Sequence, residues 1–161
     1  MTKRDFIRQL TLLFSLEGFS RKGNHFYKEA SSDILLVFGV HSSQYGGYGY
    51  LEYGYCLKSI SKYLPYPKFN QLNLNCGRIM TEVGKALVYE TLDKNTMNSL
   101  QKAIHEKIDL MGRLAASGGD RLIGFYLSEE HTESWYILGE KTAEYFRLPK
   151  DAFSGHFCED S

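Results

Sequence analysis

Two adjacent glycines, Gly46-Gly47, constrain the fold most, because a β-rich run flanks them on each side. A Gly-Gly pair can take positive φ at both central positions of a type I′ turn, which is the tightest connection between two antiparallel strands. We therefore expect a β-hairpin over residues 34–57, with the two glycines as its loop.

That loop sets a register in which the two faces of the hairpin differ, because side chains alternate along a strand. One face carries apolar and aromatic pairs and is the expected core: Val40–Tyr53, Phe38–Tyr55 and Leu36–Leu57. The other face carries tyrosines, hydroxyls and one ion pair: Tyr45–Tyr48, Ser43–Tyr50, His41–Glu52 and Gly39–Gly54. This second face is the candidate functional surface.

An N-terminal helix is predicted over residues 2–17, since apolar residues recur there at helical spacing. Thr2 and Asp5 stand at the spacing of a capping box. Gly18 occupies the position where a Schellman motif requires a left-handed residue, and Phe19 would close that motif.

Two further strands are predicted around the hairpin. Residues 21–24 form a basic turn and residues 25–30 a first strand. Leucine and asparagine alternate over residues 72–76, which predicts a fourth strand with one apolar face and one wet face.

The C-terminal half is predicted to be helical. A helix over 95–116 follows from apolar residues at steps of three and four, namely Met97, Leu100, Ile104, Ile108, Met111 and Ala115. Residues 83–91 fit either a strand or a helix; 120–128 favour a short helix, with a strand as the alternative; and 133–147 indicate a last helix.

The expected fold is therefore α+β: an N-terminal helix, a four-stranded antiparallel meander, and two or three C-terminal helices packed on one face of the sheet. We expect a single domain over residues 1–149 and a loose tail over residues 150–161.

Composition narrows the class of protein. Lysine plus arginine (19) equals aspartate plus glutamate (19), so no overall positive field favours nucleic acid. Three cysteines without a CxxC motif indicate reduced thiols and a cytoplasmic protein. No metal site or cofactor is expected, and no membrane span, since no run approaches about 20 apolar residues.

Several short motifs resemble the bacterial domain-of-unknown-function family 4304. That family has a "GFkkKGNtfyR" segment after its first helix, then "LQkS", "YGG", "yyiNLGi" and "H-x-R-x-RI". The matching segments here are GFSRKGNHFY at 18–27, VHSS at 40–43, YGG at 45–47, YLEYGY at 50–55 and GRI at 77–79. The resemblance covers residues 5–80 well and the helical half in outline.

Two departures from the family pattern fall on the candidate surface. The family's usual glutamine and asparagine are replaced here by His41 and Glu52. The resemblance implies no established activity. Some members resemble immunity proteins of bacterial toxin systems, which implies a protein partner.

Three hypotheses of function follow. The first is a non-enzymatic protein-binding module, of the immunity type, that uses Tyr45, Tyr48, Tyr50, His41, Glu52 and Arg78. The second is a small hydrolase with His41, Glu52 and Ser43 as its catalytic residues. The third is nucleic-acid or carbohydrate binding, with bases or sugar rings stacked on the same tyrosines.

Overall fold

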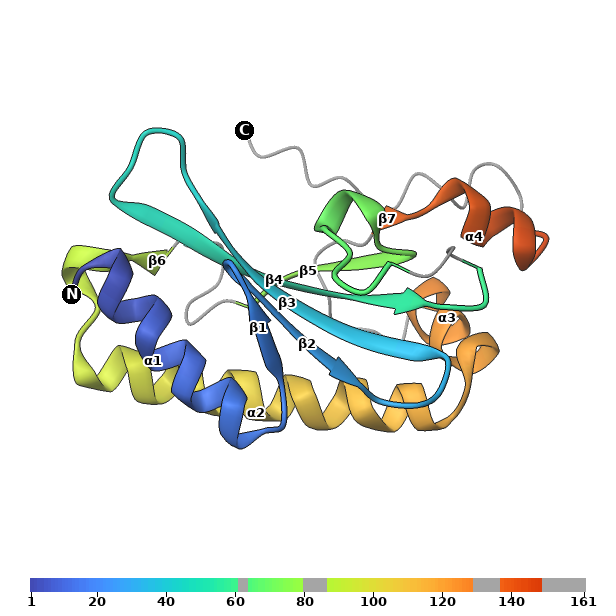
Figure 1. The fold of residues 1–161 in the computed structure, drawn as a ribbon, viewed down its shortest axis with the longest axis horizontal. Coiled ribbons are helices and arrows are strands. Elements are labelled where there is room, and N and C mark those ends of the chain that lie inside the picture. Colours follow the sequence, from blue (N-terminus) through green and yellow to red (C-terminus); the bar gives the residue numbers. More distant parts are fainter. Residues whose placement is uncertain (61–63, 80–86, 129–136, 149–161) are drawn as a thin grey trace.

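The computed structural model describes residues 1–60, 64–79, 87–128 and 137–148. Its elements are, in chain order, α1 (Lys3–Leu16), β1 (Ser20–Lys22), β2 (His25–Glu29), β3 (Ile34–Ser42), β4 (Tyr48–Leu57), η1 (Phe69–Gln71), β5 (Leu74–Ile79), β6 (Leu87–Val88), η2 (Tyr89–Thr91), α2 (Lys94–Ala116), α3 (Gly119–Leu127), β7 (Ile137–Leu138) and α4 (Glu140–Tyr145). A helix, an antiparallel sheet and then helices confirm the α+β class (Figure 1).

The sheet is larger than the predicted four-stranded meander. Its strand order is β1-β2-β3-β4-β5-β7, and β6 pairs with β4. Ser20–Lys22 form a strand that overlaps the predicted basic turn, and Leu87–Val88 form another within the ambiguous segment 83–91. The count of four was wrong because these added strands are too short to show an alternating pattern.

Both predicted ends of α1 are confirmed. The Thr2 hydroxyl accepts a hydrogen bond from the Asp5 backbone N–H at 3.1 Å, and the Asp5 carboxylate accepts from the Thr2 N–H in return. At the other end Gly18 has φ +83°, and the Phe19 N–H donates to the Phe14 carbonyl at 2.9 Å. The two phenylalanine rings lie 5.1 Å apart, so the side chains close the Schellman motif.

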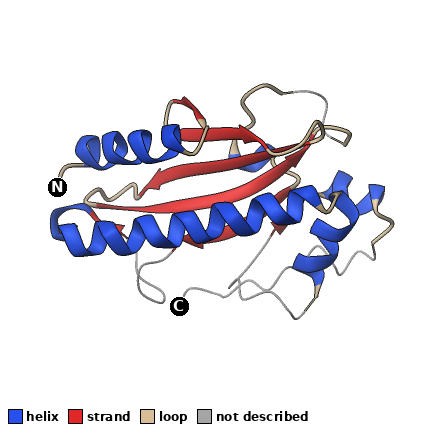
Figure 2. Cartoon of the chain, turned by 90° about the horizontal axis from the view of Figure 1, so that it is seen from below, coloured by secondary structure: helices blue, strands red, loops and turns tan. Residues whose placement is uncertain are grey.

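Helices α1 and α2 cover one face of the sheet, which we call the core face (Figures 1 and 2). β3 presents Leu36, Phe38 and Val40 to this face. All six residues that predicted α2 are buried there. Gly119–Leu127 form the helix α3, so the helical alternative for residues 120–128 is correct and the strand alternative is wrong. This helix joins the same core through Tyr126, whose hydroxyl lies 3.0 Å from that of Tyr55.

The register of the β3–β4 hairpin differs from the prediction by two residues. Phe38 lies opposite Tyr53 rather than Tyr55, and His41 lies opposite Tyr50 rather than Glu52. The other predicted pairs shift in the same way. Since a shift of two keeps every side chain on its own face, the predicted division into two faces is correct although the predicted pairs are wrong.

The hairpin loop is longer than two residues because Ser43 ends the ladder early. The Ser43 N–H donates to the Tyr48 carbonyl at 3.0 Å, and residues 44–47 connect this last pair. The Ser43 hydroxyl accepts from the Tyr45 N–H at 3.1 Å, which is a side-chain turn that competes with strand pairing. Gly46 and Gly47 do take the predicted positive φ, +75° and +74°.

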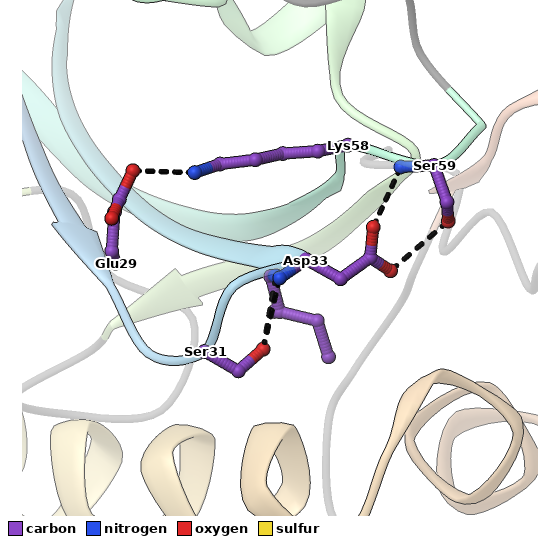
Figure 3. A network of polar contacts seen from close by, with 6 residues as sticks. Glu29, Ser31, Asp33, Lys58 and Ser59 are labelled. Atoms are coloured by element: carbon purple, nitrogen blue, oxygen red, sulfur yellow. Dashed lines mark hydrogen bonds and ion pairs between the residues drawn. The ribbon is translucent and has the colours of Figure 1, made fainter.

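A polar network at the opposite end holds the same register (Figure 3). The Asp33 carboxylate accepts from the Ser59 N–H at 2.7 Å and from the Ser59 hydroxyl at 3.0 Å. Beside it the Lys58 ammonium contacts Glu29, and the Lys58 N–H donates to the Asp33 carbonyl at 2.8 Å. The turn before β3 is thereby fastened to the end of β4.

The wet face predicted for residues 72–76 is wrong at Asn73. This side chain is 4% exposed; its Oδ1 accepts from the Leu57 N–H at 2.6 Å, and its amide donates to Thr142 of α4 at 2.9 Å. An asparagine that satisfies its hydrogen bonds inside the protein can be buried at small cost.

The last helix was predicted over residues 133–147, of which the structure describes 137–147. This prediction is wrong at Ile137–Leu138, which form the strand β7 and pair with β5. Helix α4 occupies only Glu140–Tyr145. The predicted tail, 150–161, lies outside the described residues, and the single domain over 1–149 stays a prediction.

Candidate functional site

The face of the sheet opposite the helices, which we call the second face, is closed along half of the hairpin. The segment 66–72 lies over it, and its Phe69 and Leu72 pack against side chains of the sheet. Together they form a small buried cluster: Tyr27, Leu35, Val37, Cys56, Phe69 and Leu72. The Tyr27 hydroxyl donates to the Pro67 carbonyl at 3.1 Å and so holds this segment down. This loop covers the part of the second face beyond the predicted surface pairs, and Gly39 and Gly54 of those pairs are buried beside it.

Gly39 marks where the buried half of the second face ends. A Cβ at this position would lie 2.3 Å from the Phe69 ring and 2.8 Å from the His25 ring, so only glycine leaves room for them. Phe69 contacts both His25 and His41, with ring centroids 5.6 and 5.2 Å away. Beyond this point the second face becomes polar.

Glu52 is the centre of the polar half. It is 5% exposed, yet it carries a carboxylate, and buried carboxylates require partners. Its Oε2 lies 3.1 Å from His41 Nδ1, and its Oε1 lies 3.2 Å from Arg78 Nε. The predicted contact between His41 and Glu52 therefore forms, but diagonally across the hairpin rather than between opposite residues.

Arg78 connects Glu52 to the tyrosines. It lies opposite Glu52 on β5, and its guanidinium stands 3.7 Å above the Tyr50 ring. Tyr50 in turn meets Tyr48 edge to face, with ring centroids 6.1 Å apart. A buried carboxylate thus orients an arginine, and the arginine supports a pair of aromatic rings.

Sequence reasoning singled out Arg78 and Glu52 separately and missed that they pair. The bulge between Tyr53 and Gly54 sets this part of the β4–β5 register, and no local pattern reveals a bulge. It also missed His25 and Phe69. The available signal was Gly39, a glycine within a predicted strand, which can mark the close approach of other side chains.

Ser43 and Tyr45 lie at the tip of the hairpin. Tyr45 is 83% exposed, and its backbone N–H is held by the Ser43 hydroxyl. Among the contacts of the described residues, none joins Ser43 to His41. Of the three residues of the predicted catalytic set, His41 and Glu52 are therefore in contact, whereas the predicted nucleophile Ser43 does not contact His41.

The electrostatics of the site favour neutral His25. Burial lowers the pKa of this imidazole below its usual 6.5, and the neighbouring His41 and Lys68 lower it further. Within the described residues, no group of three or more histidine, cysteine or acidic side chains is placed to hold a metal ion.

No helix in the described part of the chain is long and apolar enough to cross a bilayer. No curated protein and no solved structure matches the sequence. A family model, the domain of unknown function DUF4304, matches residues 10–111, which include the C-terminal half of α1, the hairpin, Glu52 and Arg78. Because this match spans more than half of the 161 residues, the chain belongs to the DUF4304 family.

Proposed function

We propose that the chain is a protein-binding module whose contact surface consists of Tyr45, Tyr48, Tyr50, His41 and Arg78. We call this set the tyrosine surface. The observation that carries the proposal is the stack of Arg78 on Tyr50, anchored from below by the buried carboxylate of Glu52.

This anchoring supports binding because it fixes side chains before a partner arrives. Ordering a flexible side chain at an interface costs about 0.5–1.5 kcal/mol, and part of that cost is already met here. Tyrosine and arginine are also the residues that most often dominate the energy of protein interfaces. Tyr45 at the exposed tip adds a large ring with few rotatable bonds.

The class of partner we favour is a bacterial toxin, with this chain as its immunity-type inhibitor. The support is the resemblance of some family members to immunity proteins of bacterial toxin systems. The rigid, polar and aromatic tyrosine surface is compatible with inhibition by covering a partner's site.

The hydrolase hypothesis has weaker support. Glu52 orients His41 as a carboxylate orients a general base, but Ser43 belongs to the turn and holds the Tyr45 N–H. Because no hydroxyl or thiol of the described residues contacts the His41 imidazole, we do not propose catalysis.

The experiment compares three tyrosine-to-alanine variants as baits in extracts of the source cells. Tyr45→Ala and Tyr48→Ala remove rings of the tyrosine surface, whereas Tyr145→Ala removes a 60% exposed ring of α4 as the matched control. After the partner is identified, we expect the first two variants to weaken its binding by about tenfold or more, as measured by titration calorimetry.

The control variant should bind like the unmodified chain. Equal binding by all three variants would place the interface elsewhere. Recovery of nucleic acid instead of protein, with affinity that falls steeply with salt, would support the third hypothesis instead.

A further inference from the structure

A second candidate site lies on the outside of α1, away from the tyrosine surface. A groove of about 810 Å³ runs between this helix and the turn that follows β1, and it shares no residue with the tyrosine surface. Four cationic side chains line it, Lys3, Arg4 and Arg8 from the helix and Arg21 from the strand, and all four are exposed. A groove of this size can hold a peptide segment.

The charge of the groove is strongly unbalanced, although the chain as a whole carries equal numbers of both charges. Asp5 is the single carboxylate among the lining residues, and the N-cap Thr2 already engages it. In the described part of the chain, none of the four cations forms an ion pair. The N-terminal end of α1 adds its own partial positive charge.

Arg21 is held in place at the wall of the groove. Its Nε donates to the Gly23 carbonyl at 2.7 Å, and its Nη1 donates to the Thr11 hydroxyl at 3.0 Å. Thr11 in turn donates to the Ile7 carbonyl at 2.7 Å, so the arginine is tied to the helix backbone. Such a fixed guanidinium is suited to a carboxylate ligand.

Two exposed leucines follow the arginines along the outer side of α1. Arg4, Arg8, Leu12 and Leu16 recur every four residues and form one exposed stripe on the helix. Leu12, which also lines the groove, is 63% exposed, and Leu16 is 89% exposed. A ligand that matches the stripe carries negative charge at one end and an apolar group at the other.

This combination selects one kind of occupant. A nucleic-acid backbone offers phosphates but no apolar group for the two leucines, and a flat anionic bilayer does not enter a concave groove. We infer that the groove binds an acidic peptide segment of a partner protein, with carboxylates against Arg4, Arg8 and Arg21 and an apolar side chain against Leu12.

The test is selection of binders from a displayed library of random peptides of about 12 residues, which in extended form are longer than the 14-residue helix α1. We expect enriched sequences to combine aspartate or glutamate with a leucine or an aromatic residue. A selected peptide, labelled with a fluorophore, should lose about tenfold or more in affinity for the Arg8→Glu variant and weaken clearly for Leu12→Asp.

The matched control is Lys102→Glu, which reverses an 80% exposed cation on α2, outside the groove. The affinity of this variant for the peptide should stay within about twofold of that of the unmodified chain, because salt screens an exposed charge that does not line the groove. Thermal unfolding of Arg8→Glu and Leu12→Asp should change little, since both side chains are exposed and, among the described residues, neither forms an ion pair or side-chain hydrogen bond. The Tyr48→Ala variant should bind the peptide normally, which separates this groove from the tyrosine surface.

Three results would overturn the inference. They are a library without acidic enrichment, equal loss for Arg8→Glu and Lys102→Glu, and tighter binding of a single-stranded oligonucleotide or of phosphatidylserine vesicles than of the selected peptide.

Discussion

Leu35 and Leu36 are neighbours on β3, yet they enter two very different environments. Leu36 lies in the core face, in one continuous cluster that α1, α2 and α3 close. Leu35 lies in the second face, in a cluster of six residues that, in the described part of the chain, the segment around η1 closes. The same strand therefore has one face covered by helices and one face covered by a loop.

The difference explains where the candidate site is found. On the core face the long helix α2 runs along the sheet (Figure 2), whereas on the second face the buried cluster reaches as far as Gly39, which the Phe69 ring contacts. Toward the tip, the described residues of the second face are polar or aromatic, and the buried apolar cluster does not extend to them. A buried carboxylate in that position is costly to keep, which is why its two partners, His41 and Arg78, are central to the site.

The largest expected effect comes from truncating the two leucines. Leu36→Ala should lower the free energy of unfolding by about 3–5 kcal/mol, because the surrounding helices cannot collapse into the cavity. Leu35→Ala should cost about 2–3 kcal/mol, because the covering loop can move in. Urea denaturation of both variants measures the difference.

This pair is its own control, since the residue type, the strand and the substitution are the same. Equal losses, at equal dependence on urea concentration, would show that the loop packs as firmly as the helices and would remove the contrast between the faces.

An intermediate effect is expected from neutralising the buried carboxylate. Glu52→Gln keeps the shape of the side chain but removes the charge that faces His41 and Arg78, and should cost about 1–3 kcal/mol of unfolding free energy. The control is Glu29→Gln, where the carboxylate is 66% exposed against Lys58, and the expected change is within about 0.5 kcal/mol.

A cost for Glu52→Gln no larger than that for Glu29→Gln would mean that the carboxylate does not anchor the arginine. An NMR spectrum adds a second readout, because loss of the anchor should shift the ring signals of Tyr50, over which Arg78 stacks.

The smallest effect is the pH dependence that His25 contributes. Its pKa in the folded chain lies below the usual 6.5, so the unfolded chain takes up the proton more readily. Neutral His25 therefore contributes its full share to the free energy of unfolding above about pH 6.5. This contribution declines as the pH falls below 6.5 and stops changing below the pKa of the folded chain. His25→Gln should flatten this part of the unfolding profile between about pH 7 and pH 5.

Proton NMR can test the cause separately. Because His41 contributes to the low pKa of His25, the His41→Gln variant should raise that pKa toward 6.5. An unchanged profile for His25→Gln, together with an unchanged His25 titration in His41→Gln, would contradict the coupling of the two rings.

The sequence by itself determined the features that depend on neighbours along the chain. The ends of α1, the buried stripe of α2 and the assignment of each hairpin residue to a face follow from periods of 3.6 and 2 and from short capping motifs. These signals are local, so no distant part of the molecule can change them easily.

The tertiary structure alone decided how distant segments align. The hairpin register depends on the Ser43 turn and on the Asp33–Ser59 network; the pairing of Glu52 with Arg78 depends on a bulge; and the burial of Asn73 depends on α4. Apart from the local Ser43 turn, each of these contacts joins residues far apart in the sequence, whose spacing carries no periodic signal. The sequence therefore predicted the residues of the tyrosine surface, while the fold decided which of them touch.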